Sequence, residues 1–166
     1  MSNNLPAEVA AAFDNHDSLT TRDGSGVVTT TAFDGTVTAD TGEATTAYTV
    51  TVVVPTIESA TSGEVGDAVA ADWVRTLRRR LEDAPTATRA AVDLDSFEVE
   101  TRDDTVRVEY GFSYTSPARA ARIATAFVEF VEGTYVEGIV PGYEYESPVA
   151  DLLSQASQGE KGGTPL

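Results

Sequence analysis

Alternating apolar and polar residues along three segments of the chain predict β-strands with one buried face. Residues 18–39 fit a short strand, a tight turn and one long strand, and residues 44–55 fit a third strand. Residues 97–114 fit a hairpin that turns at Asp103-Asp104. The pattern therefore predicts five strands, each with its apolar side chains toward a core and its polar side chains toward water.

Apolar residues three or four positions apart predict helices before, between and after these strands. The first helix covers residues 5–16, and the second lies within residues 58–85, where five apolar residues recur at every fourth position. The third begins at Ser116, an N-cap residue that is followed by Pro117 at the first helical position, and it ends at Gly138. A short helix follows near the C-terminus.

The order of elements, αβββαββα with a short C-terminal helix, predicts an α+β domain. Its helices cover one face of a single five-stranded antiparallel sheet, which gives two layers. This topology is similar to that of the small dimeric secretion-chaperone fold, a likeness that carries little weight for function. Residues 1–156 form the single predicted domain. Residues 157–166 have almost no apolar side chains and are predicted to be a disordered tail.

The composition favours a protein of the cytoplasm. The chain has 166 residues, which suits one domain, and no cysteine, which excludes disulfides and thiolate metal sites. No segment approaches the ~20 apolar residues of a membrane span. The N-terminus has neither the basic region nor the apolar run of a secretory signal. We therefore expect a cytoplasmic location and no membrane partner.

The charge of the chain is strongly negative. There are 27 Asp and Glu residues against 11 Lys and Arg, which gives a net charge of −16, and the acids are spread evenly. Such an excess keeps a protein soluble in molar salt, where a Debye length of ~3 Å makes the self-repulsion small. We interpret the acidity as adaptation to high salt. Nucleic acid is disfavoured as a partner, because contacts to phosphates need a basic patch.

Residues for catalysis are few. His16 is the single histidine, and at the end of the first helix it fits a cation that caps the helix C-terminus. Carboxylates around Asp95 and at Asp103-Asp104 could bind Mg²⁺ or act as a pair in hydrolysis, yet in a chain this acidic such spacings arise by chance. We predict no catalytic residue, no cofactor and no bound metal. A small carboxylate-based enzyme, or a binder of a small molecule or Mg²⁺ with a pocket between helices and sheet, is the alternative.

The only concentration of basic residues is "RTLRRRLED", at the end of the second helix. Arg75, Arg78 and Arg79 project away from the apolar stripe of that helix and could contact an anion or an acidic partner. The other interpretation is an outer face of intrahelical ion pairs. The pairs with suitable spacing are Asp72–Arg75, Arg78–Glu82 and Arg79–Asp83.

The segment "TYVEGIVPGYEY", residues 134–145, contains three of the six tyrosines. Its Pro141-Gly142 fits a turn that needs a positive φ at the glycine. The segment could fold back as a lid over the open end of the core, or it could bind another chain, since aromatic residues are enriched at interfaces. The residues of this possible partner interface are Tyr135, Ile139, Val140, Tyr143 and Tyr145.

Three strings in the chain are distinctive: "AFDNHDSL", "DWVRTLRRRLEDA" and "VEGTYVEGIVPGYEYESPV". Through them the chain resembles, over nearly its whole length, a small family of uncharacterised domains from halophilic archaea. The resemblance agrees with adaptation to high salt and implies no activity, cofactor or site residue. The sequence therefore predicts a non-catalytic protein-interaction module whose partner is unknown and could be a second copy of the chain.

Overall fold

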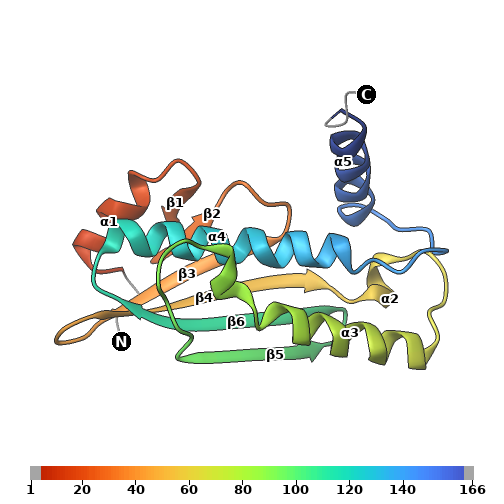
Figure 1. The fold of residues 1–166 in the computed structure, drawn as a ribbon, viewed down its shortest axis with the longest axis horizontal. Coiled ribbons are helices and arrows are strands. Elements are labelled where there is room, and N and C mark those ends of the chain that lie inside the picture. Colours follow the sequence, from red (N-terminus) through yellow and green to blue (C-terminus); the bar gives the residue numbers. More distant parts are fainter. Residues whose placement is uncertain (1–4, 163–166) are drawn as a thin grey trace.

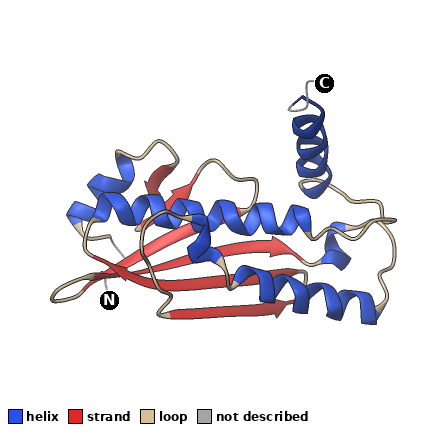
Figure 2. Cartoon of the chain, viewed as in Figure 1, coloured by secondary structure: helices blue, strands red, loops and turns tan. Residues whose placement is uncertain are grey.

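The computed structural model describes residues 5–162 of the protein. Six strands form one antiparallel sheet, and helices cover one of its faces (Figures 1 and 2). The predicted α+β class is confirmed, whereas the predicted count of five strands is wrong. The elements in chain order are α1 (Ala7–Asp14), β1 (Leu19–Arg22), β2 (Ser25–Val28), β3 (Asp34–Thr41), β4 (Thr46–Pro55), α2 (Ile57–Ala60), α3 (Asp67–Leu81), the 3₁₀ helix η1 (Ala84–Ala87), β5 (Ser96–Arg102), β6 (Thr105–Tyr114), α4 (Pro117–Glu137) and α5 (Val149–Gly162).

The strands lie across the sheet in the order β1-β2-β3-β4-β6-β5. The central pair, β4 and β6, is antiparallel in register from Thr46↔Tyr114 to Pro55↔Thr105. Between these two strands the chain leaves the sheet to form α2, α3 and η1, and returns as the edge strand β5. The predicted hairpin of β5 and β6 is confirmed, and its turn places Asp103 at a φ of 50°.

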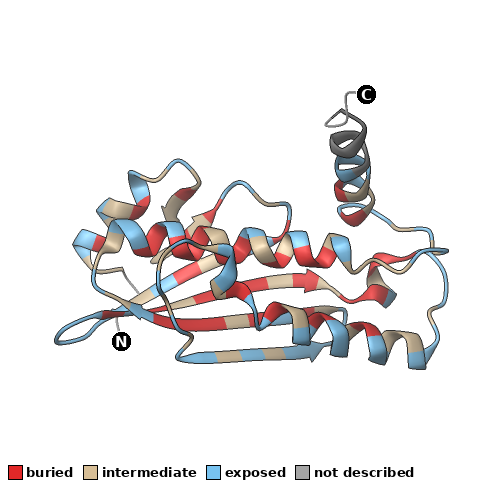
Figure 3. Ribbon diagram, viewed as in Figure 1, coloured by how far each residue is buried: buried red, intermediate tan, exposed pale blue. Residues whose placement is uncertain are grey.

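The core lies between the sheet and α4, which runs along the length of the sheet (Figure 1). Phe127 of α4 contacts the rings of Tyr110 and Phe112 on β6, with ring centroids 5.1 and 5.5 Å away. The Tyr110 hydroxyl donates a hydrogen bond of 2.7 Å to the carbonyl of Leu81 at the end of α3. Buried positions are concentrated on the central strands and α4 (Figure 3). The residues of β4 and β6 that face this core are Thr46, Tyr48, Val50, Val52, Val54, Val106, Val108, Tyr110 and Phe112.

The long strand predicted within residues 18–39 is interrupted, and this interruption gives the sheet its sixth strand. The carboxylate of Glu132 on α4 accepts hydrogen bonds from the backbone N–H groups of Ala32 and Phe33, at 2.7 and 3.2 Å. These two N–H groups bond to the helix instead of a neighbouring strand, so residues 29–33 form a loop between β2 and β3.

The interruption also changes which residues of the segment face the core. The buried residue of the Val27-Val28 pair is Val28, although Val27 has the parity of the buried Phe33 and Val37. In β3 the buried positions are Gly35 and Val37. At Gly35 the strand lies so close to α4 that a Cβ atom would be 2.4 Å from Cγ1 of Val128, which only a glycine avoids.

The second predicted helix is two helices. Its first residues form α2, and α3 begins only at Asp67. Between them Thr61 is extended and pairs with Tyr145, far along the chain. Gly63 and Gly66 lie in the same connection, where glycine costs helix stability. The pairing with a distant segment therefore ends α2 after one turn.

The ends of the later helices agree more closely with the sequence pattern. The Ser116 side chain accepts a hydrogen bond from the Arg119 N–H, which confirms it as the N-cap of α4. Helix α5 stands away from the other helices in Figure 1, and its first turn packs on the core through Val149 and Leu152. Its backbone continues to Gly162, within the segment for which the sequence predicts disorder; residues 163–166 lie outside the described residues. Within residues 5–162 no helix has both the length and the hydrophobicity to span a bilayer.

Candidate interaction groove between α3 and α4

A hollow of about 260 Å³ lies between α3 and the C-terminal end of α4. We call it the α3–α4 groove. Both segments that the sequence singled out, the arginine-rich helix and residues 134–145, contribute to it. Its lining residues are Val69, Asp72, Trp73, Thr76, Leu77, Arg80, Thr134, Gly138 and Val140.

Two rows of α3 residues with a spacing of four form one side of the groove. Val69, Trp73 and Leu77 form the apolar row, and two of them are also core residues. The second row carries Asp72 and Arg80 at its ends, eight positions apart. Because a helix rises about 1.5 Å per residue, the two charges lie about 12 Å apart along the axis. The groove is therefore elongated, acidic at one end and basic at the other.

Trp73 is the only tryptophan of the chain, and its side chain is only 6% exposed. Its ring packs edge-on against Tyr135, with centroids 5.5 Å apart. The indole N–H is buried and has no hydrogen-bond partner in the described part of the chain. Leaving such a donor unpaired costs roughly 1–3 kcal/mol.

An ion pair separates the groove from a second hollow. Arg80 donates to the carboxylate of Glu137 at the end of α4. The hollow beyond the pair measures about 310 Å³ and shares Arg80 and Thr134 with the groove. The pair is solvent-exposed, with 40% of the arginine and 68% of the glutamate side chain accessible, so it adds little to stability. Displacing Glu137 would join the two hollows at small cost.

Tyr135, the first residue of the possible interface, is a core residue. It is fully buried, and its hydroxyl donates a hydrogen bond of 3.0 Å to the carbonyl of Pro55. Burial is the main reason why the pKa of Tyr135 is raised, and the nearby Tyr145 adds to the increase. In this conformation Tyr135 presents no surface to a partner.

The residues after α4 are fastened to the chain's own core. Ile139 and Val140 pack against it, as does Tyr145, whose hydroxyl donates to the carbonyl of Val140. Burial of Tyr145 raises the pKa of its hydroxyl, and the bond to Val140 opposes that increase. Gly142 has a φ of +95°, as the predicted turn requires. Tyr143 is half-buried, like Tyr145, and is not among the residues that pack against this core.

Hydrogen bonds to the connection after α2 hold this segment in place. The Ser62 N–H donates to the Glu144 carbonyl at 3.0 Å, and the Glu146 N–H donates to the Ala60 carbonyl at 2.8 Å. Val140 thereby becomes a fixed wall of the α3–α4 groove. The segment that folds back over the core therefore also forms one wall of the groove.

The predicted arginine cluster is exposed on the outside of α3. Arg75 pairs with Asp72 at 3.4 Å, as predicted, whereas Arg78 and Arg79 form no ion pair with any described carboxylate. The predicted pairs of these two with Glu82 and Asp83 are therefore wrong. At roughly 100° per residue, Arg79 follows the rim of the groove beside Asp72, and Arg78 lies on the other flank.

The other candidates from the sequence do not converge. Among the described residues, no group of three or more His, Asp or Glu side chains is arranged to hold a metal ion. Asp95 accepts a hydrogen bond from the Ser113 hydroxyl at 2.7 Å. The His16 Nδ1 atom accepts one from the Ser18 N–H at 3.2 Å. This contact places the His16 ring against the loop after α1, and its role as a capping cation stays a prediction.

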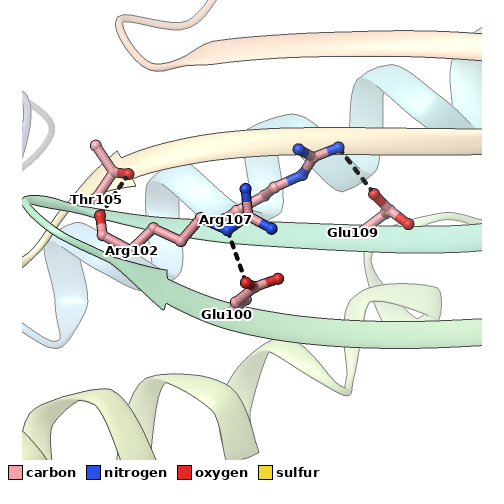
Figure 4. Close-up of polar contacts among 5 residues, drawn as sticks. All are labelled: Glu100, Arg102, Thr105, Arg107 and Glu109. Carbon is pink, nitrogen blue, oxygen red and sulfur yellow. Dashed lines mark hydrogen bonds and ion pairs between the residues drawn. The ribbon is translucent and has the colours of Figure 1, made fainter.

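The face of the sheet that no helix covers carries charged pairs in place of a hollow with an apolar floor. In Figure 4, Arg102 pairs with Glu100 at 2.7 Å and Arg107 with Glu109 at 3.2 Å. The first pair lies on β5 and the second on β6, and in each pair the two residues are two positions apart along the strand. Both arginines are thus paired, whereas Glu98, which lies opposite Glu109, has no ion pair among the described residues.

Sequence reasoning missed Thr76, Arg80 and Thr134 as groove residues. Trp73 and Leu77 were assigned only to a buried stripe, and Arg80 to its edge. No local pattern identifies a groove, because the groove exists only where α3 and α4 lie against each other.

These features define an α+β protein with a groove in the helical layer on one face of its sheet. Residues 14–155 match the model of a family of unknown function, DUF5813, and the chain belongs to this family. No curated protein and no solved structure matches the chain.

Proposed function

We propose that the protein is a non-catalytic protein-interaction module and that the α3–α4 groove is its interaction surface. The observation that carries this proposal is the apolar row of Val69, Trp73 and Leu77 along one wall of an open groove. A peptide segment suits this wall, because its apolar side chains fill hollows of this kind. Buried aromatic residues in pockets are also the common anchors of protein interfaces.

The charges at the groove favour an acidic partner segment. Arg79 and Arg80 lie along the rim, and only Arg80 has an ion-pair partner among the described residues, the exposed Glu137. A carboxylate of the partner would replace Glu137 at Arg80. This gives specificity more than affinity, as charge complementarity usually does.

The setting of the module is part of the proposal. A net charge of −16 supports a protein that works in molar salt, in the cytoplasm of a halophilic archaeon. A second copy of the chain is one candidate partner.

A small-molecule binder is the second candidate function. The volume of the groove, about 260 Å³, is close to the lower end of ligand pockets, which begin near 300 Å³. A carboxylate-based enzyme or a Mg²⁺ site has less support, because in the hollow of about 240 Å³ that carries Glu98, Glu100 and Glu109 two of these glutamates are paired with arginines.

Selection from a displayed library of random linear peptides, in molar KCl, tests the module. We expect enriched peptides with an apolar residue next to an acidic one, and a change in Trp73 fluorescence when they bind. Thr76→Phe should fill the groove and weaken binding at least tenfold. Thr38→Phe, the same change at an exposed site on the uncovered sheet face, should not.

Two results would count against the module. One is a selection that enriches no peptide, and the other is binding that survives Thr76→Phe unchanged. Sedimentation of the full chain in the same salt decides whether a second copy is the partner, because Thr76→Phe should then shift dimers to monomers.

A further inference from the structure

A second, larger hollow lies at the opposite end of α4. It measures about 670 Å³ and is formed by the first turns of α4 and the residues that follow η1. We call it the arginine hollow. Its lining residues are Ala87, Thr88, Arg89, Ala90, Ala91, Tyr114, Arg119, Arg122, Ile123 and Ala126.

Three arginines from two distant segments surround this hollow. Arg89 comes from the loop after η1, and Arg119 and Arg122 come from α4. None of the three forms an ion pair or a side-chain hydrogen bond with a described carboxylate. The chain has 27 acidic and 11 basic residues, so most of its surface is negative. The lining of this hollow has three arginines and no acid, so here the local charge is positive.

The position of two of these arginines is unfavourable for the helix itself. Arg119 and Arg122 lie in the first two turns of α4, and the first turn contains no acidic residue. The positive end of a helix dipole disfavours a cation in the first turn, where Arg119 lies. Ser116 already caps the Arg119 N–H, so the arginine side chains, and not the backbone, are the groups left for an anion.

The floor of the hollow is apolar. Ile123 is fully buried, Ala126 and Ala90 are half-buried, and the ring of Tyr114 is half-buried at one side. On α4 the residues Arg119, Arg122, Ile123 and Ala126 share one face, with spacings of three, four and seven. A ligand can therefore place a negative group at the arginines and an apolar body on the floor.

We propose that the arginine hollow binds a small molecule with a phosphate monoester on a flat, apolar body, as in a nucleoside monophosphate. The planar guanidinium group matches phosphate oxygens with two parallel hydrogen bonds, which makes arginine the usual residue for this group. A volume of about 670 Å³ falls within the range of small-ligand pockets.

The charge of the remaining surface favours a small anion over a polymer. The phosphates of a nucleic acid would extend past the three arginines onto the rest of the surface. The chain has a net charge of −16, so that surface would repel them. A single phosphate meets only the local field, because charges farther away than the Debye length, ~10 Å at 0.1 M salt and ~3 Å at 1 M, are screened.

Titration of the full chain with pyrophosphate and adenosine 5′-monophosphate, followed by NMR of the arginine Nε–H groups, tests the proposal. We expect saturable shifts at Arg89, Arg119 and Arg122 with both probes, and tighter binding of the nucleotide. Adenosine, which lacks the phosphate, should cause none. The double variant Arg119→Gln/Arg122→Gln should weaken nucleotide binding by roughly tenfold or more. The variant Arg119→Lys/Arg122→Lys keeps the positive charges but loses the planar guanidinium groups, and it should weaken binding by less.

The control variant is Arg22→Gln/Arg102→Gln, which changes the net charge equally on strands far from the hollow and should bind as the wild type does. Thermal unfolding in the absence of ligand shows whether each variant is folded. Absence of saturable shifts with pyrophosphate overturns the proposal, as does an equal loss in the control. Tighter binding of a thymidine oligonucleotide or a phosphoserine peptide than of the nucleotide also overturns it, in favour of a macromolecular partner. None of these outcomes bears on the α3–α4 groove.

Discussion

The two faces of the sheet are built from the same strands and have different roles. Along β4, Val50, Val52 and Val54 point to the helices and are fully buried, whereas Thr51 and Val53 between them point to the uncovered face and are half-exposed. Valine thus occurs on both faces, and only the presence of α4 over one of them decides what it contributes. Burial, more than residue type, distinguishes the faces.

The comparison also indicates where recognition is possible. On the uncovered face both arginines of β5 and β6 are paired with glutamates of their own strands, so neither is left for a ligand (Figure 4). In the helical layer the helices do not fill all the space between them, and hollows are left at both ends of α4. Both of our proposals for binding lie in that layer for this reason.

The largest expected effect is that of Phe127→Ala. Phe127 is fully buried against two aromatic rings of β6, and its removal should lower the free energy of unfolding by about 3–5 kcal/mol. Denaturant unfolding at constant salt measures this. Phe130→Ala, the same change at a half-buried site on the same helix, should cost clearly less. Equal losses would show that α4 is not packed as described.

Substitution of two neighbouring valines of β4 compares directly how much each face of the sheet contributes to stability. Val52→Ala removes fully buried methyl groups and should cost about 2 kcal/mol. Val53→Ala, on the uncovered face, should cost about 0.5 kcal/mol, as surface changes do. The same unfolding experiment compares them. A reversed order would mean that something covers the outer face in solution.

The buried tyrosines make the covered face sensitive to alkali. Burial raises the pKa of Tyr110, so the folded protein keeps the phenol protonated where the unfolded chain ionises, near pH 10. Stability is therefore complete below pH 10 and falls as pH rises above it, by up to about 1.4 kcal/mol per pH unit for this group. Unfolding measured at pH 8 to 11 should show the decline, and Tyr110→Phe should reduce its slope.

At neutral pH, Tyr110→Phe should itself cost about 1 kcal/mol, since it leaves the Leu81 carbonyl without its 2.7 Å partner. Tyr143→Phe, at a half-exposed ring, is the control and should leave the neutral stability unchanged. A slope above pH 10 that Tyr110→Phe does not alter would assign the alkaline loss to other groups.

The smallest effect is expected on the uncovered face. Arg107→Gln breaks the exposed pair with Glu109 and should cost at most about 0.5 kcal/mol in dilute buffer, and less in molar salt. Unfolding at both ionic strengths measures it. A loss that grows with salt would contradict the view that these pairs are ordinary surface contacts.

Local patterns predicted the parts of the fold that depend on neighbouring residues. The hairpin of β5 and β6, the buried row of Tyr110 and Phe112, and the Ser116 cap all follow from spacing within one segment. The break between β2 and β3 could not be predicted in this way, because Glu132 causes it from 99 and 100 residues away.

The candidate sites were harder to predict for the same reason. The Tyr135 to Tyr145 segment and the arginines of α3 stood out in the sequence, but only the packing of α3 on α4 shows that they share a groove. Arg119 and Arg122 carry a visible signal, since basic residues are uncommon in the first turns of a helix. Their meeting with Arg89 depends on a loop whose path no local pattern fixes.

Strand β4 can pair with β6 only after the ribosome has synthesised both strands. On the ribosome, Pro55 is made about 50 residues before its partner Thr105, an interval of roughly 3–10 s at common rates of synthesis. Throughout that interval the most apolar strand of the protein has an open edge, which is the arrangement that leads to aggregation. The nascent protein therefore needs protection for a few seconds, and slowing translation within α3 should lower the yield of soluble protein.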